Sequence, residues 1–205
     1  EQLWKELPKG KKSSVNRAKR EGIIIERITT DEQIEQFYGL HTMSMTRGER
    51  ANQPSLDYFK SMFAALQRHD LMAGFLALHP QTRKPIAAVT LLLGMHKEAT
   101  YWAVGQDYEY RTLGATDFLV WHCLEFLKQK GYTAFDLVGL PEGDSPRAEG
   151  IRHFKTAWAG SNGQKQESYV VTHSNIAFLS PTMTMTLLNS FRKALSFITS
   201  AVRRR

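Results

Sequence analysis

The sequence predicts an α/β protein with one mixed sheet, flanking helices and a C-terminal amphipathic helix. Segments rich in β-branched and aromatic residues alternate with segments of helical spacing along the chain. Between residues 71 and 104, three strand-like segments follow one another with short connections, which is the pattern of an antiparallel meander. A further strand-like segment comes after a long helical one, so it joins the sheet through a helix. The predicted order is β-α-α-β-β-β-α-β-α-β-α.

The composition is that of a globular protein able to bury a core. The 205 residues suit one large domain with appendages, and 42% of them are hydrophobic. No apolar run approaches the roughly 18 residues that a membrane-spanning helix needs, and no secretory signal is visible. Cys123 is the only cysteine, so no internal disulfide can form. This fits a reducing compartment, and we expect a cytoplasmic protein.

The first part of the chain predicts a basic helix followed by a strand. Residues 12–21 follow helical spacing, with Ser13 or Ser14 as the cap and Gly22 as the end of the helix. Residues 23–28 are rich in isoleucine, which favours a strand. The residues up to Gly22 are therefore expected to form a basic lead-in to the main domain.

Two amphipathic helices are predicted after the first strand. Thr30 and Asp31 can cap the first helix, and the second begins at about Ser55, after a polar loop over residues 47–54. Their apolar positions recur every three or four residues, as in helices that bury one face. These positions are Ile34, Phe37, Tyr38 and His41 in the first helix and Leu56, Phe59, Phe63 and Leu66 in the second.

Three strands form the predicted meander. They cover residues 71–78, 86–93 and 100–104, and a turn over residues 80–85 joins the first two. The strand at 86–93 is apolar at nearly every position, which indicates burial on both faces.

A nearly all-apolar helix is predicted over about residues 113–130, with Gly131 as its end. A helix that is apolar almost all round is buried, so we expect this one to lie between the sheet and another element. A strand at residues 134–138 follows it.

The loop after that strand, over residues 139–150, contains three glycines and two prolines. It is longer than a simple connection requires, and loops of this length often carry function. The remaining pattern predicts a short helix at 151–158, a strand at 168–172 and a final helix at 184–202. The final helix has an apolar stripe flanked by basic residues, which suits docking on protein or contact with an anionic membrane.

The net charge of +7 is concentrated at the two ends of the chain. Residues 1–20 carry a net charge of +5 and residues 192–205 another +5, so the body between them is mildly acidic. Basic ends suit contact with phosphate, in nucleic acid or in lipid headgroups. Solvated ends that keep the protein soluble are the other interpretation.

The segment Arg111–Thr116 opens the apolar helix and is a candidate anion site. A helix N-terminus offers unpaired backbone N–H groups and a partial positive charge. Gly114 lets the backbone approach a ligand, and Arg111 adds a formal charge beside it. Ala115 and Thr116 begin the helix. A plain helix start with a surface arginine has the same spacing, so both interpretations stay open.

The strand at residues 100–104 is followed by R-x-x-G-x-x at a helix start and then by another strand. This order resembles the central signature of the GNAT acyltransferase superfamily. The resemblance to its Fem-type branch rests on four stretches, namely YWAVGQDYEYRTLGATDFLVWHCLEFLKQKGYTAFDLVGLP, GIRHFKTAWAG, KSSVNRAKREGIII and SLDYFKSMFAAL. The resemblance as a whole covers most of residues 3–160. The resemblance implies a GNAT-like transferase domain, which we place at residues 23–180, with the basic amphipathic helix in residues 181–205.

Fem-type enzymes transfer amino acids from aminoacyl-tRNA to peptidoglycan precursors. The resemblance therefore implies an aminoacyl-tRNA donor, a cell-envelope precursor as acceptor, peripheral contact with the inner face of the membrane and no tightly bound cofactor. Fem-type proteins usually carry two GNAT-like domains, so the chain, which begins at Glu1, is expected to be the second of them. The alternatives are an N-acyltransferase that uses acyl-CoA, in exopolysaccharide or exosortase systems, and a non-catalytic module that binds tRNA or membrane.

The resemblance also implies roles for residues around the long loop. Lys155 matches an F-K pair of the family and would stabilise the charge on a carbonyl under amine attack, or bind the donor. Phe154 would shape the donor pocket or stack on an adenine, or else pack in the core. Asp136 would orient the amine or accept its proton, or else bind the following loop. Arg147 and Arg152 are candidate phosphate contacts.

The basic helix near the N-terminus supplies the candidate contacts to a nucleic-acid donor. Contacts between such side chains and phosphates make binding depend on salt. The five residues are Lys11, Lys12, Arg17, Lys19 and Arg20.

Other kinds of site have little support in the sequence. The seven histidines are scattered without the spacing of metal ligands, so we expect no metal site, and His122 suits a core position. The G-x-S-x-G, Walker and G-x-G-x-x-G patterns are absent, so hydrolase, P-loop and dinucleotide-binding functions are unsupported.

Overall fold

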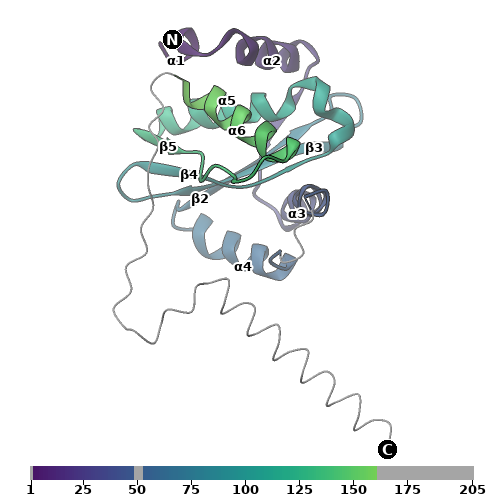
Figure 1. Ribbon diagram of the computed structural model, residues 1–205. Coiled ribbons are helices and arrows are strands. Elements are labelled where there is room, and N and C mark those ends of the chain that lie inside the picture. The colour runs from purple at the N-terminus through teal and green to yellow at the C-terminus, as the bar shows by residue number, and fades with distance from the viewer. Residues whose placement is uncertain (1, 49–52, 161–205) are drawn as a thin grey trace, which may run out of the picture. The chain divides into compact units, whose positions relative to one another are not determined.

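A five-stranded sheet lies between two groups of helices in the computed structural model, which describes residues 2–48 and 53–160 (Figure 1). The strands are β1 (Ile24–Arg27), β2 (Met72–Leu78), β3 (Pro85–Leu93), β4 (Glu98–Gln106) and β5 (Ala134–Asp136). The α-helices are α1 (Gln2–Glu6), α2 (Lys9–Arg20), α3 (Asp31–Thr46), α4 (Leu56–Gln67), α5 (Ala115–Gln129) and α6 (Pro146–Ala159). A 3₁₀ helix, η1 (Tyr108–Leu113), connects β4 to α5.

The strands lie side by side in the order β1-β2-β3-β4-β5. The first four are antiparallel to their neighbours, and β5 runs parallel to β4. The predicted meander is therefore confirmed, and so is the strand that enters the sheet through a helix. Strand β3 is buried at almost every position, as its continuous apolar sequence predicted.

Each face of the sheet has its own apolar cluster. On one face, α5 packs on β2 and β3 and is covered in turn by α2, with Val15 and Leu119 fully buried between them. On the other face, α3 and α4 bury Phe37 and Phe63 against the sheet. The prediction that the apolar helix lies between the sheet and another element is thus confirmed, and that element is α2 (Figure 1).

Several predicted helix ends are confirmed by their hydrogen bonds. The Thr30 hydroxyl accepts a bond from the backbone N–H of Gln33, whose side chain accepts one from Thr30 in return, so the two form a capping box. The Ser55 hydroxyl accepts from the N–H of Tyr58 at the start of α4. Gly131 takes a left-handed φ of 75° directly after α5.

Three element boundaries differ from the prediction. Helix α2 begins at Lys9 rather than residue 12, so Ser13 and Ser14 lie inside it and neither caps it, because Pro8 already precedes the first turn. Helix α5 begins at Ala115, after η1 and the left-handed Gly114. Strand β5 ends at Asp136, since Val138 has a φ of 65° that no strand can hold.

Helix α6 also begins earlier than predicted. Pro146 occupies its first turn, and the Ser145 hydroxyl accepts a bond from the N–H of Ala148. The loop predicted over residues 139–150 therefore ends at Ser145. The strand predicted at residues 168–172 and the helix predicted at 184–202 lie outside the described residues.

Candidate functional site

Strands β4 and β5 separate after Thr100, the third of the nine residues of β4. Strand β5 pairs only with Glu98, Ala99 and Thr100, whereas β4 continues to Gln106. At the same place Tyr101 pairs with Leu91 but Ala103 with Thr90, so β4 carries an extra residue, Trp102, as a bulge. Among the described residues, the part of β4 from Tyr101 to Gln106 therefore has no strand partner on the β5 side.

Helix α3 crosses the part of β4 that has no partner on the β5 side and contacts the backbone of that part directly. A Cβ added to Gly105 would lie 2.4 Å from the Leu40 carbonyl carbon, so only glycine permits the approach. His41 Nδ1 lies 2.8 Å from the carbonyl oxygen of Val104, and the N–H of Gln106 donates to the Ser44 hydroxyl at 2.9 Å. These side chains satisfy polar backbone groups that a neighbouring strand would otherwise bind.

His41 is a residue that the sequence argument did not single out. A carbonyl oxygen only accepts, so the hydrogen sits on Nδ1, and Nε2 of the neutral ring is an acceptor. The ring is 6% exposed and stacks on Phe37. The helical spacing of His41 in the sequence correctly predicted that it is buried. No sequence signal pairs it with Val104, 63 positions away.

The two residues predicted to be catalytic meet at the turn that follows β5. Asp136 Oδ1 accepts a hydrogen bond from the N–H of Val138 at 2.7 Å. Lys155 Nζ, on α6, donates to the carbonyl oxygens of Gly139 at 2.7 Å and Val138 at 3.4 Å. Val138 is β-branched and left-handed, a conformation that persists only when its surroundings hold it. Both side chains thus shape one strained turn beside the point where β4 and β5 diverge.

The two arginines predicted to flank the loop both donate to backbone carbonyls. Arg152 Nη1 donates to Pro141 at 3.0 Å and to Gly143 at 2.6 Å, which fixes the loop on α6. Arg147 Nη2 donates to the Ser44 carbonyl at 3.3 Å, so the start of α6 meets the end of α3.

The Gly114 turn is packed against α2. Gly114 has a φ of 75°, and an added Cβ would lie 2.4 Å from the Ser14 carbonyl oxygen. Arg17 Nη1 donates to the Thr112 carbonyl at 3.0 Å. The close approach that a glycine permits is therefore used here for contact between two helices. In the same turn, the Thr116 hydroxyl is buried without a hydrogen-bond partner among the described residues.

A carboxylate in the first turn of α5 joins three helices. Asp117 Oδ1 accepts from Lys11 Nζ of α2 and from Trp158 Nε1 of α6, both at 2.8 Å. Lys11 Nζ also lies 4.3 Å from the ring centroid of Phe154, which packs against the core. The start of α5 therefore already holds a negative charge, and that charge is paired within the protein.

Four of the five basic residues proposed for nucleic acid contact the protein itself. Lys11 and Arg17 bind α5 and η1 as described, Lys12 Nζ donates to the Lys5 carbonyl at 2.7 Å, and Lys19 Nζ lies 5.6 Å from the Trp4 ring centroid. No such contact is seen for Arg20 within the described part of the chain.

Arg111, the charged residue of the predicted anion site, lies against Tyr108. Its guanidinium carbon is 4.2 Å from the ring centroid of Tyr108, and Nη1 donates to the Tyr108 carbonyl at 3.1 Å. The guanidinium of Arg47, from the end of α3, lies 4.9 Å from the same ring. The structure thus brings Arg111 together with Arg47, which the sequence argument did not name.

Burial favours the neutral forms of Cys123, Tyr101 and His122. Burial raises the pKa of Cys123 and of Tyr101 far above neutrality, so neither is ionised at pH 7. Burial also lowers the pKa of His122, which packs edge to face on Phe75; the residue is half-buried, so the predicted core position is not reached. A thiolate at Cys123 is therefore not available as a nucleophile.

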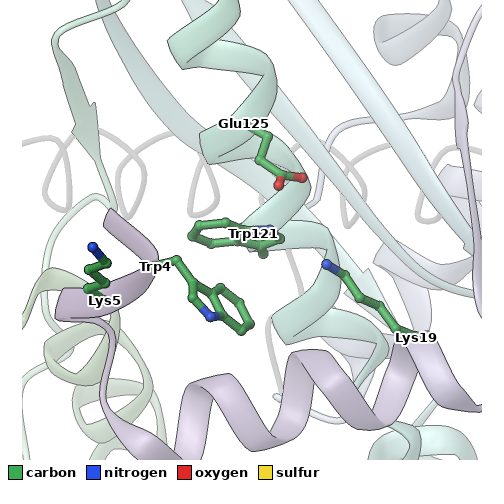
Figure 2. Close-up of a pocket in the computed structure, with 5 residues that line it drawn as sticks. All are labelled: Trp4, Lys5, Lys19, Trp121 and Glu125. Carbon is green, nitrogen blue, oxygen red and sulfur yellow. The ribbon is translucent and has the colours of Figure 1, made fainter. Parts of the chain in front are cut away.

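A pocket of about 490 Å³ opens between α1, α2 and α5 (Figure 2). It is lined by Trp4, Lys5, Lys19, Trp121 and Glu125. The two indole rings meet edge to face with centroids 4.8 Å apart, and Trp121 Nε1 is buried without a partner among the described residues. None of the lining residues belongs to β4, β5 or α6, so the pocket is separate from the site at the diverging strands.

Within residues 2–48 and 53–160, no three His, Cys, Asp or Glu side chains gather closely enough to bind a metal ion. No helix in that part of the chain is both long and apolar enough to span a bilayer.

Comparison with solved structures shows the same fold in several proteins. The chain is similar to FemX, with a TM-score of 0.66 and 14% identity over 77% of this chain and 55% of that one, so it spans about half the length of FemX. An aminoglycoside acetyltransferase from an uncultured soil metagenomic sample, in complex with sisomicin, has a TM-score of 0.52 and 17% identity over 75% and 97%. A predicted acetyltransferase with acetyl-CoA from Clostridium acetobutylicum has a TM-score of 0.52 and 8% identity over 77% and 99%.

At these identities the likenesses show the fold alone. No curated protein matches the chain. A family model does match it, over residues 9–156, and that model describes an acetyltransferase (GNAT) domain. The match includes the diverging strands, the Gly114 turn, α5 and most of α6. Because it covers more than half of the chain, the protein belongs to the GNAT acetyltransferase domain family.

Proposed function

We propose that the protein forms an amide bond by transferring an acyl group from an activated ester or thioester to an amine, at the part of β4 that has no partner on the β5 side. The observation that carries this proposal is the end of β5 pairing at Thr100 while β4 continues to Gln106. The strands separate beside the turn that Asp136 and Lys155 hold. His41 and Ser44 already bind the backbone groups of Val104 and Gln106, so an extended donor would lie against the part of this strand edge before Val104, where backbone groups can still form hydrogen bonds.

The chemistry proposed for the site is direct attack of the amine on the donor carbonyl, which forms the amide bond, breaks the ester or thioester bond and releases the alcohol or thiol, which takes up the proton that the amine loses. Cys123 stays protonated in the core, so an acyl-enzyme thioester on that residue is disfavoured as an intermediate. Lys155 would stabilise the negative charge on the attacked carbonyl, which its place beside the end of β5 supports. Asp136 would orient the turn and the amine. Positioning the two substrates side by side supplies much of the rate.

For the donor, we propose aminoacyl-tRNA, as in Fem-type enzymes, with a cell-envelope precursor as the acceptor at the inner face of the membrane. The sequence resemblance over most of residues 3–160 supports this proposal, and the fold shared with FemX agrees with it. The donor would be bound by Arg111, Gly114, Ala115 and Thr116, by Phe154, Arg147 and Arg152, and by the basic residues of α2.

Acyl-CoA is the second candidate donor. Two observations favour it. A structure of the same fold contains acetyl-CoA, and most basic side chains of α2 contact the protein itself rather than extending outward. Such side chains are less available to the phosphates of a tRNA.

The deciding experiment offers both donors to the purified chain. Aminoacyl-tRNA carrying a radiolabelled amino acid and radiolabelled acetyl-CoA are each incubated with a panel of amines, and amide products are identified by mass spectrometry. Transfer from tRNA supports the Fem-type assignment, and transfer from acetyl-CoA alone replaces it with the second candidate. If neither donor reacts and tRNA nevertheless binds, the proposal of catalysis fails and a binding module remains.

A salt titration of tRNA binding locates the contact. One variant is neutral at Lys12, Arg17 and Lys19, and the other at Arg203, Arg204 and Arg205, which lie outside the described residues. Each lost phosphate contact should flatten the salt dependence by roughly one unit. We expect the first variant to lose slope, and loss in the second alone would contradict the assignment to α2.

A further inference from the structure

We propose that the pocket between α1, α2 and α5 binds a free α-amino acid with an aromatic side chain. We call it the indole pocket, and its residues are Trp4, Lys5, Lys19, Trp121 and Glu125. This ligand binds away from the diverging strands, so the inference goes beyond the proposed function and does not rest on it.

The apolar part of the indole pocket is formed by two tryptophan rings. Trp4 of α1 and Trp121 of α5 meet edge to face, with centroids 4.8 Å apart. Trp121 is 7% exposed and Trp4 is half-buried, so the rings line the inside of a pocket rather than a flat surface. The volume of about 490 Å³ lies within the range of about 300–1,000 Å³ that is typical of small-molecule sites. An aromatic side chain of a ligand packs well on such rings.

Three exposed charged side chains surround the two rings (Figure 2). The ammonium of Lys19 and the carboxylate of Glu125 both point toward Trp121 from one side, whereas Lys5 lies on the other side, beyond Trp4. Within the described part of the chain, neither Lys19 nor Glu125 forms an ion pair. The pocket therefore offers a positive and a negative group that no ion pair of the described residues already uses.

The elements of the pocket hold these two groups near the rings. Lys19 Nζ lies 5.6 Å from the ring centroid of Trp4 and 5.8 Å from that of Phe118. Both distances are within the range in which a ring attracts an ammonium group. Glu125 is four residues after Trp121 on α5, so the two side chains share one face of that helix.

A zwitterionic amino acid complements this arrangement. Its α-carboxylate would bind Lys19 and its α-ammonium would bind Glu125, while its side chain packs on the indole rings. Hydrogen bonds between charged groups are stronger than those between neutral groups. A ligand with a carboxylate alone would be repelled by Glu125, and a ligand with an ammonium alone would be repelled by Lys19. The pocket thus favours a ligand that carries both charges next to each other.

A polar group in one of the rings supports a ligand at this place. Trp121 Nε1 is buried and has no hydrogen-bond partner among the described residues. Buried donors without a partner are rare in folded proteins. One such donor in a ring that lines a pocket indicates an acceptor that the described residues do not supply.

The first helix completes the pocket from outside the matched transferase domain. Trp4 and Lys5 precede residue 9, where the match to the GNAT domain begins, whereas α5 lies within it. Helix α1 is held in place because Leu7 is buried after it and Lys12 Nζ of α2 donates to the Lys5 carbonyl at 2.7 Å. The indole pocket therefore depends on a segment that the domain itself does not include.

Binding of L-phenylalanine to the full chain, measured by isothermal titration calorimetry, tests the inference without any transfer reaction. Lys19→Met and Glu125→Gln should each weaken binding by about five- to tenfold, as expected for loss of a charge-assisted hydrogen bond at a partly exposed site. Trp4→Leu should weaken it by about threefold or more. The control variants Lys9→Met, at the start of α2, and Glu32→Gln, on α3, remove the same charges at exposed positions elsewhere and should leave binding unchanged.

Two analogues of phenylalanine test the assignment of each charged contact. 3-Phenylpropanoate lacks the ammonium group, so Glu125→Gln should not weaken its binding, whereas Lys19→Met should. 2-Phenylethylamine lacks the carboxylate, so the reverse should hold. Both analogues should bind more weakly than phenylalanine, and glycine, which lacks the ring, should bind more weakly as well. Tighter binding of either analogue than of phenylalanine would overturn the amino-acid assignment.

Thermal unfolding gives an independent measurement of the same contact. A ligand that binds only the folded chain raises its Tm, so phenylalanine should raise the Tm of the wild type more than that of Lys19→Met or Glu125→Gln. Circular dichroism checks that each variant is folded. No binding of phenylalanine, equal losses in the control variants, or unchanged binding in folded Trp4→Leu would each overturn the inference. Binding of phenylalanine by a chain that transfers from neither donor would support the indole pocket while the proposed function fails.

Discussion

Replacing Gly114 with alanine tests the packing of α2 on the turn that opens α5. A Cβ at this position would lie 2.4 Å from the Ser14 carbonyl oxygen and 2.9 Å from its hydroxyl. The left-handed φ of 75° costs any other residue about 1–2 kcal/mol, and overpacking against a neighbour adds about 1–3 kcal/mol. We therefore expect Gly114→Ala to lower the free energy of unfolding by about 2–5 kcal/mol.

Gly131 provides the matched control for this change. Its φ is also 75°, but a Cβ added there would meet no heavy atom within 4 Å. Gly131→Ala should therefore cost only the backbone term of about 1–2 kcal/mol. Urea denaturation of the two variants, followed by far-UV circular dichroism, gives the difference, which we expect to be about 1–3 kcal/mol. Equal losses of stability in both variants would refute the reasoning, because Ser14 would then not fill the space beside Gly114.

This result also decides how the anion site should be probed. A residue larger than glycine at position 114 is expected to disturb the contact between α2 and α5, so weaker donor binding in such a variant has two explanations. Arg111→Gln removes a charge from an exposed side chain and leaves that contact in place. It is therefore the cleaner test of whether this segment binds phosphate.

Three further outcomes follow from contacts at the site. Lys155→Ala should lower kcat and kcat/KM together by about 100-fold if the ammonium stabilises the transition state; steady-state kinetics that leave both unchanged would return Lys155 to a purely structural role. The hydrogen bond from Lys84 lowers the pKa of Asp107 in the folded protein. The ionised carboxylate therefore stabilises the fold fully above the unfolded pKa of about 3.9. That stabilisation is lost as the pH falls through the folded pKa. The difference in unfolding free energy between wild type and Asp107→Asn should therefore shrink on acidification, and a difference that stays constant with pH would contradict this. Lys11→Met should lower the free energy of unfolding, measured by thermal or urea unfolding, by about 1–3 kcal/mol. The loss is smaller than for a fully buried pair because the side chains of Lys11 and Asp117 are 12% and 18% exposed. An unchanged free energy of unfolding would show that Asp117 needs no cation.

The sequence predicted the elements of this fold better than their ends. Thr30 was predicted as a cap, and the start of α4 was placed at about Ser55, because side-chain capping is a local property that depends on residues within three positions of the helix start. The start of α6 was missed because Gly150 and Pro146 looked like loop residues, although proline is well suited to a first helical turn. Local sequence spacing cannot distinguish a proline in a loop from a proline in the first turn of a helix.

The site was predictable where it depends on neighbours in sequence and less so where distant segments meet. The sequence named the R-x-x-G turn, Asp136 and Lys155 as candidates, and the structure brings the last two to one turn. That Gly114 meets Ser14, 100 positions earlier, depends on how α2 docks on α5, which no local pattern encodes. The pairing of Arg111 with Arg47 has the same origin.

Hydrogen bonds from side chains of α6 set the direction of the peptide groups in the loop after β5. Lys155 and Arg152, one turn apart, bind the carbonyl oxygens of residues 138, 139, 141 and 143. In a planar trans peptide the N–H of the next residue points opposite to the carbonyl. The amide hydrogens of residues 139, 140, 142 and 144 are therefore directed away from α6. The two basic side chains thus orient a row of backbone donors along the outer side of the loop.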